Sequence, residues 1–160
     1  MSNGEAFIKK LYLQMYDFLL EYAKASLGSV SLAEEAVQDT FVIAWKKQDA
    51  LSASENPEGW LVNTLKNVIS NTRKSQNSAN QLLQAYLTVN KITDTEAENQ
   101  LPFETLYQDL AETEELKLIR EMAVDGCSYL EMAERRGISM EACRKRVQRA
   151  KEFLRKKLSD

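Results

Sequence analysis

The strongest constraint on the fold comes from residues 128–158, where two helical patterns follow each other across a three-residue turn. Ser128-Tyr-Leu-Glu131 is a capping box, in which the first and fourth side chains satisfy free N–H groups at the start of a helix. Residues 137–139, Gly-Ile-Ser, then end this short helix and cap a longer one. The layout predicts a helix-turn-helix.

The longer helix is strongly basic, although the formal net charge of the chain is -3. Residues 135–157 hold ten Lys or Arg and two acids, a net +8, and residues 102–134 carry -7. A helical wheel predicts a core face around Cys143 and Val147, with Lys151 and Arg155 on one edge of the opposite face. Hydrogen-bonding side chains at the centre of a helix and cations at its edges suit the major groove of DNA. The alternative is a solvated basic helix without a ligand. The predicted DNA-contacting residues are Glu141, Ala142, Arg144, Lys145, Arg146, Gln148 and Arg149.

The rest of the chain also favours helices, and strand signals are nearly absent. Apolar residues recur at helical spacing from Phe7 to Tyr22, and Ser31-Leu-Ala-Glu34 predicts the start of a second helix. Asn56-Pro57 predicts the start of a third, and Thr113 caps a later helix that stops at Gly126. We therefore predict an all-α protein with a three-helix domain at 1–74, a linker at 75–101 and a helix-turn-helix domain at 102–160.

Composition argues against several classes of protein. The chain has no histidine and only two cysteines, and it lacks the glycine-rich and nucleophile motifs of common enzymes. We predict no enzymatic activity, no cofactor and no metal site. Cys127 and Cys143 are interpreted as small buried hydrophobes, with a redox role as the alternative. No apolar run is long enough to span a membrane and no signal-peptide pattern is visible, so we expect a soluble cytoplasmic protein without direct membrane insertion.

Three stretches together resemble a known family. Residues 128–158, "SYLEMAERRGISMEACRKRVQRAKEFLRKKL", resemble region 4 of a sigma-70-type factor of the extracytoplasmic-function (ECF) group. Residues 33–45, "AEEAVQDTFVIAW", and residues 55–74, "ENPEGWLVNTLKNVISNTRK", are similar to region 2 of that group. The resemblance implies a dissociable subunit that directs bacterial core RNA polymerase to specific promoters.

The resemblance also implies a division of labour between the two domains. Region 4 would read the -35 element as duplex DNA, and region 2 would bind polymerase and open the -10 element. Family members hold a flipped base in the loop that corresponds to residues 49–56. The third helix carries an acid-poor face of amides and hydroxyls, which suits single-stranded DNA, although a solvated surface is the alternative. For Trp60, packing against the second helix competes with base contact. The predicted -10 residues are Trp60, Asn63, Lys66, Asn67, Asn71, Arg73 and Lys74.

The second helix is apolar on more than one side. A wheel centred on Val37 predicts that Phe41, Ala44 and Trp45 face the core, and that Leu32, Ala36, Val42 and Ile43 lie outside that arc. An apolar surface left over after folding indicates a partner, with burial by a neighbouring domain as the alternative. The resemblance names the clamp helices of the polymerase β′ subunit. The predicted polymerase-binding residues are Glu35, Gln38, Asp39 and Val42.

Further partners follow only from the resemblance. They are the β flap of polymerase, promoter DNA and an inhibitory anti-sigma factor. Two other classes stay open at this point. One is a stand-alone helix-turn-helix regulator that binds paired half-sites as a dimer without polymerase. The other is a pure interaction protein whose acidic and basic segments contact protein partners.

Overall fold

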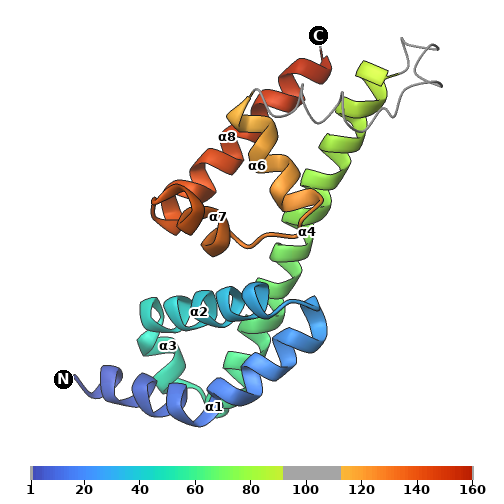
Figure 1. The fold of residues 1–160 in the computed structure, drawn as a ribbon. Coiled ribbons are helices and arrows are strands. Elements are labelled where there is room, and N and C mark those ends of the chain that lie inside the picture. Colours follow the sequence, from blue (N-terminus) through green and yellow to red (C-terminus); the bar gives the residue numbers. More distant parts are fainter. Residues whose placement is uncertain (1, 92–112, 160) are drawn as a thin grey trace. The chain divides into compact units, whose positions relative to one another are not determined.

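The structure, a computed structural model, describes residues 2–91 and 113–159. Every regular element in these two stretches is an α-helix, which confirms the all-α prediction (Figure 1). The chain divides into two compact units, Met1–Lys74 and Ser75–Asp160, called unit 1 and unit 2 below. The helices are α1 (Asn3–Leu27), α2 (Val30–Lys46), α3 (Gln48–Ala53), α4 (Pro57–Lys91), α6 (Glu114–Ala123), α7 (Tyr129–Arg136) and α8 (Met140–Ser159).

The junction between α1 and α2 is shorter than the sequence predicted. Gly28 ends α1 in the left-handed conformation with φ at 69°, which a residue without Cβ adopts at little cost. Ser29 follows with an extended backbone, and its hydroxyl accepts a hydrogen bond of 3.2 Å from the N–H of Leu32. The predicted capping box at Ser31 was therefore wrong by two residues, because Ser29 already caps the helix.

The start of α4 agrees with the sequence, but the preceding loop does not. Asn56 Oδ1 accepts from the N–H of Gly59 at 3.1 Å, so Asn56 caps the helix and Pro57 occupies its first turn, as predicted. Most of the predicted loop 49–56 forms the short helix α3. The reason is Leu51, which is completely buried and draws this turn of chain into the core.

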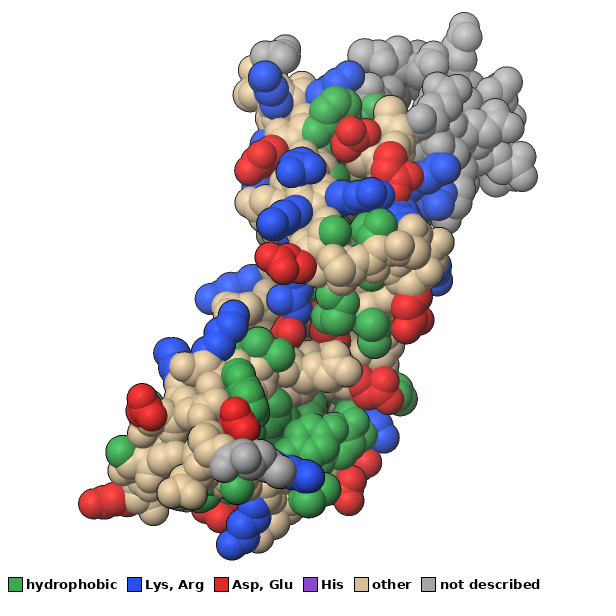
Figure 2. Space-filling model, turned by 90° about the vertical axis from the view of Figure 1, so that its left-hand side faces the viewer, with side chains coloured by type: hydrophobic (Ala, Val, Ile, Leu, Met, Phe, Trp, Pro, Cys, Tyr) green, Lys and Arg blue, Asp and Glu red, His purple; other side chains and the backbone are tan. Residues whose placement is uncertain are grey.

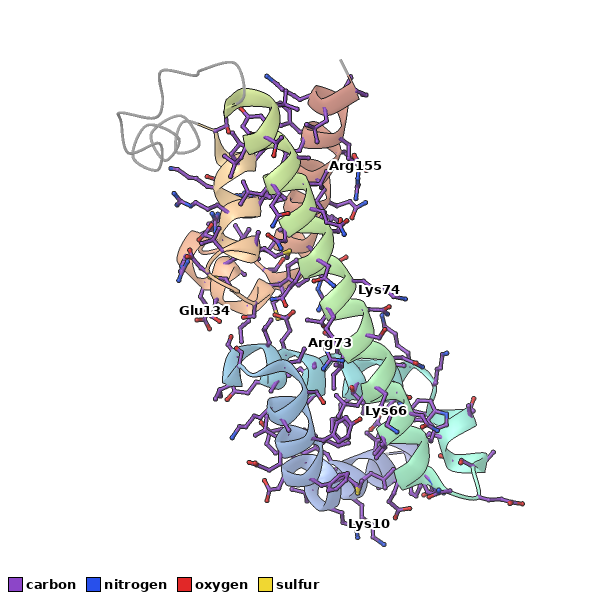
Figure 3. The ribbon with its side chains drawn as sticks, turned by 90° about the vertical axis from the view of Figure 1, so that its right-hand side faces the viewer. Lys10, Lys66, Arg73, Lys74, Glu134 and Arg155 are labelled. Carbon is purple, nitrogen blue, oxygen red and sulfur yellow. The ribbon has the colours of Figure 1, made fainter. Side chains whose placement is uncertain are left out.

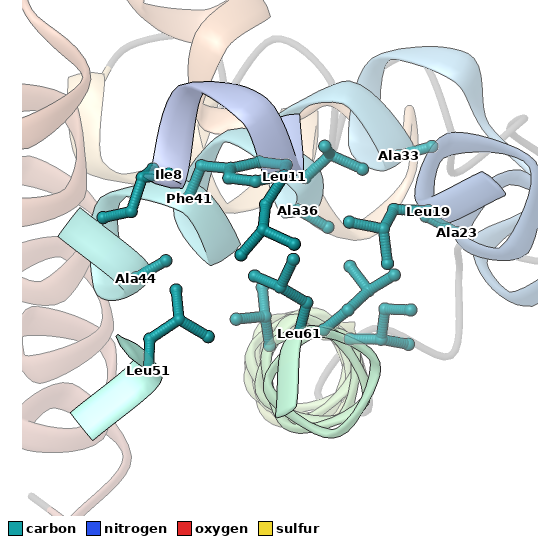
Figure 4. Close-up of a cluster of buried hydrophobic side chains, with 14 residues drawn as sticks. Ile8, Leu11, Leu19, Ala23, Ala33, Ala36, Phe41, Ala44, Leu51 and Leu61 are labelled. Carbon is teal, nitrogen blue, oxygen red and sulfur yellow. The ribbon is translucent and has the colours of Figure 1, made fainter. Parts of the chain in front are cut away.

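Unit 1 encloses one apolar core between α1, α2, α3 and the first half of α4 (Figure 4). The only polar side chain fully buried there, Thr40, donates its hydroxyl to the carbonyl of Ala36 at 2.8 Å and leaves no unmatched donor. None of the described helices is long and apolar enough to cross a membrane. In the described part of unit 1, the largest fully buried apolar side chains are Leu19, Val37, Leu51, Leu61 and Leu65.

The predicted linker was wrong over residues 75–91. They continue α4 as helix, and Ala79 and Leu83 lie buried in the core of unit 2. Unit 2 therefore begins at Ser75 and not near Pro102, which lies with residues 92–101 outside the described part of the chain. The break between units falls after Lys74, where the first predicted domain ends.

The core of unit 2 joins the second half of α4 to α6, α7 and α8. Its buried members include Ile119 on α6, Met132 on α7 and Leu154 on α8. The two cysteines, 127 and 143, are buried in this core and form no disulfide, in agreement with their interpretation as small hydrophobes. Burial also raises the pKa of the Cys127 thiol, which keeps it protonated and unreactive.

The helix that precedes the helix-turn-helix ends earlier than predicted. Thr113 occupies the N-cap position of α6, but its side chain makes no capping hydrogen bond. The helix ends at Ala123, and Gly126 then adopts φ 64° so that the N–H of Cys127 donates to the carbonyl of Glu121 at 3.0 Å. The capping box on α7 is confirmed, since the hydroxyl of Ser128 accepts from the N–H of Glu131 at 3.1 Å.

A cluster of ion pairs fixes α7 against α6. The carboxylate of Glu121, which is 7% exposed, accepts from Arg135 at 2.8 Å and also from Arg136. Arg136 extends the cluster to Glu114 at 2.6 Å. Burial alone would raise the pKa of Glu121, but the hydrogen bonds and charges of the two arginines outweigh it and lower the pKa. The helix-turn-helix thus rests on a carboxylate that must stay ionised.

We predict that Leu83→Ala weakens unit 2 selectively. The substitution removes a buried side chain and should cost about 2–4 kcal/mol of unfolding free energy. Amide hydrogen exchange should therefore accelerate in α6 and α8 and stay unchanged in α1 and α2. Gln84→Ala, at the exposed neighbouring position, is the control and should change little. Equal exchange rates in both variants would mean that residues 75–91 behave as a linker after all.

We also predict that Glu121 makes the helix-turn-helix sensitive to acid. Because its pKa is lower in the folded state, ionised Glu121 stabilises the fold above its unfolded pKa of about 4.3. That stabilisation is lost as the pH falls through the folded value. In Glu121→Gln, the thermal midpoint should be lower at pH 7 and should fall less between pH 5 and pH 3 than in the unaltered chain. Glu134→Gln, which alters an exposed acid on α7, should keep the original acid dependence.

Candidate nucleic-acid and partner interfaces

The turn before α8 places this helix against α6 and α7. Gly137 adopts φ 63°, and the N–H of Ile138 donates to the carbonyl of Ala133 at 3.1 Å. The hydroxyl of Ser139 then accepts from the N–H of Ala142 at 3.1 Å, which confirms Ser139 as the cap of α8. The apolar side of α8 is buried in the core of unit 2, through Cys143, Val147, Ala150 and Leu154.

The opposite side of α8 carries the predicted DNA-contacting residues. Ala142 and Arg144 are half-buried, because they lie at the border with the core. Arg144 places its guanidinium 5.3 Å from the centre of the Tyr129 ring, a cation–π distance that restrains the side chain. Contact with DNA stays a prediction for all seven. The remaining five are exposed: Glu141, Lys145, Arg146, Gln148 and Arg149.

The centre of this face can both donate and accept hydrogen bonds. Lys145 Nζ lies 3.7 Å from the carboxylate of Glu141 one turn earlier, and both side chains are exposed. Such an exposed pair is weak, so both groups can exchange it for a ligand at little cost. A carboxylate accepts from the cytosine amino group, whereas lysine and glutamine donate to guanine and adenine edges. The face therefore has the chemistry to distinguish base pairs.

Lys151 does not belong to this face, which corrects the wheel. Its side chain is 6% exposed, and Nζ donates to the carbonyl and the hydroxyl of Ser75 at 2.8 and 3.0 Å. Burial lowers the pKa of Lys151, and nearby Arg155 adds to the effect. The wheel failed here because it treats every cation as solvated, whereas the second half of α4 covers this side of α8.

A second polar face lies on the first half of α4. Lys66 and Lys74 project from it two turns apart, about 12 Å along the helix (Figure 3). No acid occurs on α4 after Glu58 in its described part. A strip of amides with cations can hydrogen-bond bases and follow a phosphate backbone. The predicted residues that are exposed there are Asn63, Lys66, Asn67, Asn71 and Lys74.

The other two predicted residues of α4 have contacts inside unit 1. Trp60 is half-buried and packs against the apolar core, as the packing interpretation proposed. Arg73 donates from Nη2 to the carbonyl of Ser26 at 2.5 Å, near the end of α1. This bond satisfies a carbonyl in the last turn of a helix, where a cation is also favoured by the helix dipole. Arg73 is thus held against α1, although its side chain remains exposed.

The predicted polymerase-binding residues on α2 separate into two groups. Gln38 and Val42 are exposed, and Val42 retains 50% exposure. Asp39 is half-buried and Glu35 is 4% exposed, so the prediction of an exposed Glu35 and Asp39 was wrong.

The apolar residues of α2 were also assigned incorrectly in part. Leu32 and Ala36 were expected outside the core, but both are buried. Trp45 was expected in the core, but it is 50% exposed. The apolar surface of α2 that remains exposed is therefore smaller near Leu32 than predicted, and it extends toward Trp45 instead.

Sequence reasoning missed an aromatic cluster that α1 adds beside α2. The ring of Tyr12 lies 5.1 Å from that of Tyr16 and 4.9 Å from that of Phe41, which it meets edge-on. Burial and the neighbouring Tyr12 raise the pKa of Tyr16. The helical spacing of apolar residues shows that α1 has an apolar side, but it does not reveal which aromatic rings remain exposed. Figure 2 shows apolar side chains gathered on unit 1, in the lower half of the view. The large exposed apolar side chains of unit 1 are Tyr12, Leu13, Phe18, Val30, Val42 and Trp45.

The described residues offer no metal site, whereas the comparison with known protein families gives a match. Within the described stretches, no group of three or more Cys, Asp or Glu side chains is arranged to hold a metal ion. A search of curated proteins found no match to the chain. Residues 11–79, however, match the family model for sigma-70 region 2, a segment that covers most of unit 1 and the first turn of α4 in unit 2. This segment of the chain is therefore similar to sigma-70 region 2.

Proposed function

We propose that the chain is a sigma factor of the ECF type, which directs core RNA polymerase to specific promoters. The observation that carries this proposal is the region 2 match over residues 11–79. A helix-turn-helix with a basic exposed helix supports it from the other unit. A protein that acts with polymerase on DNA works in the cytoplasm, so we propose a cytoplasmic location. The proposed action is regulatory and not enzymatic.

Unit 1 would bind polymerase and open the -10 element. The exposed amides and cations of α4 suit a single strand, because they can track phosphates and reach base edges without repulsion from acids. Asn63, Asn67 and Asn71 are the proposed base contacts, and Lys66 and Lys74 the proposed phosphate contacts. Trp60 is proposed to support this face from behind, since it packs on the core.

Unit 2 would read the -35 element as duplex DNA. Lys145 and Gln148 lie on the side of α8 away from the core and are the proposed base readers. Arg146 and Arg149 lie on its flank and are the proposed phosphate contacts. The β flap of polymerase is the proposed protein partner of this unit. An anti-sigma factor is a further proposed partner of the whole chain.

The polymerase contact is proposed for α2 near Val42. An exposed valine and tryptophan on one helix, next to exposed Gln38, form the mixed surface expected of a protein interface. The β′ clamp helices are the proposed partner. Glu35 drops out as a direct contact because it is buried, and Asp39 contributes at most through its half-exposed side chain.

Footprinting with and without core polymerase tests the proposed function. We expect specific protection of -35 and -10 sequences, and opening of the -10 region, only when chain and polymerase are combined. The chain alone should protect little, because residues 102–134, which precede the basic segment in the sequence, carry a net charge of -7 and should repel DNA. Specific protection of paired half-sites by the chain alone would instead favour a stand-alone dimeric regulator.

A matched pair of substitutions tests the polymerase contact. We predict that Val42→Lys abolishes capture of core polymerase in a pull-down, because it buries an unpaired charge in the interface. Its thermal midpoint should stay within a few degrees, since Val42 is 50% exposed. Val30→Lys, at a 55% exposed position about 120° away around the same helix, should bind polymerase normally. Equal binding by the two variants would exclude this placement of the interface.

A further inference from the structure

The part of α4 that belongs to unit 2 has an exposed side with unusual composition. Its apolar side is buried through Ala79 and Leu83. No Asp or Glu occurs between Gly59 and Val89, although the chain holds 24 acids in 160 residues. Solvated helices normally mix both signs of charge. The exposed polar residues of this segment are Asn77, Asn80, Gln81, Gln84 and Thr88.

Hydrogen bonds from two side chains of α8 fix the orientation of this segment. Lys151 holds Ser75, as described above, and Arg155 Nη2 donates to the hydroxyl of Ser78 at 3.2 Å. Gln81 follows Ser78 by three residues, so both side chains lie on the side of α4 that borders α8. Arg155 follows Gln148 by seven residues, which is two helical turns, so these side chains share one side of α8. Ser78 and Gln81 therefore adjoin the exposed face of α8.

We propose that Ser78, Gln81 and Arg155 form a second DNA contact, directed at the sugar–phosphate backbone of the duplex read by α8. The Ser78 hydroxyl accepts from Arg155, so its own hydrogen can be donated to a phosphate oxygen. Arg155 is exposed and has further N–H donors, and the Gln81 amide adds two more. Such side chains supply a large share of protein contacts to DNA phosphates and sugars.

Charge complementarity selects DNA as the occupant of this surface. A polyanion is repelled by acids, and this side of α4 has none. The exposed cation Arg155 attracts the phosphates, whereas the ammonium of Lys151 is hydrogen-bonded to Ser75 inside unit 2. The proposal rests on the proposed role of α8 in reading duplex DNA. Of its two α4 residues, Gln81 lies beyond the region 2 match, which ends at residue 79.

Asn80 provides a matched control on the same helix. It lies two residues from Ser78, about 160° away around the helix, and so faces away from α8. Its Oδ1 accepts from Gln84 Nε2 at 3.4 Å, which places these two amides together on the other side. Asn80 and Gln81 are both exposed. A charge placed at Asn80 therefore tests long-range electrostatics and helix stability without touching the proposed contact.

The experiment measures promoter complexes formed by the full chain and core polymerase. Hydroxyl-radical footprints show which sugars are protected, and dissociation into a competitor is followed at several salt concentrations. We expect Gln81→Glu to shorten the lifetime about three- to tenfold and to remove protection at one edge of the -35 element. Asn80→Glu should change the lifetime by less than about twofold. Gln81→Lys should lengthen the lifetime and increase the salt slope by about one, whereas Asn80→Lys should not.

The longer lifetime expected for Gln81→Lys cannot result from misfolding, because a damaged fold does not bind DNA more tightly. Equal effects at positions 80 and 81, in either direction, would overturn the proposal. So would loss of polymerase binding in Gln81→Glu, which would show that the surface binds protein. Failure of the unaltered chain to protect the -35 element would instead count against the proposed function, and this contact would fall with it.

Discussion

Burial of one side of α4 is the constraint on which both units depend. Leu61, Leu65 and Ile69 from its first half lie in the core of unit 1, and Ala79 and Leu83 from its second half lie in the core of unit 2. A helix of this length is stable only if its apolar side is covered, because propensity contributes little in water. Within each unit, this burial leaves the other side of the helical segment exposed. Both proposed nucleic-acid surfaces on α4 follow from that division.

One acid of unit 2, Glu121, is neutralised in the interior of the unit. The acid Glu121 lies inside and binds Arg135 and Arg136, so it does not oppose a polyanion outside. The cations that remain exposed on α8 have no buried partner to neutralise them. Glu121 thus stabilises the helix-turn-helix, while the exposed cations of α8 remain available to DNA. A chain of net charge -3 can present a basic surface because many of its cations are concentrated in residues 135–157.

Local sequence signals predicted the helices and their caps well, and they failed where tertiary contacts decide. The caps at Asn56, Ser128 and Ser139 were found because a capping side chain and its N–H lie within three residues. Residues 75–91 were predicted as a linker with at most one short helix at 81–89, because their polar side has no charge pattern. Their apolar residues Ala79 and Leu83 are buried in the core of unit 2, which local signals do not reveal. For the same reason Glu35 was expected to be exposed: no single-helix wheel contains the neighbours that cover it. On α8, the wheel placed Lys145, Gln148 and Arg149 correctly on the exposed side, but it missed the burial of Lys151 because it does not contain α4.

The charge available to DNA is smaller than the count in the sequence. Of the ten cations in residues 135–157, Arg135 and Arg136 are engaged with acids of unit 2, and Lys151 is buried against Ser75. Only cations that meet phosphates release counterions, so the salt dependence of binding should reflect the exposed ones. Lys157 also has a contact within α8, since its ammonium lies 5.2 Å from the centre of the Phe153 ring. The three cations Arg135, Arg136 and Lys151 instead join α7 to α6 and α8 to α4. The exposed side of α8 can therefore stay rigid while it presents its remaining cations, and rigidity lowers the entropy lost on binding.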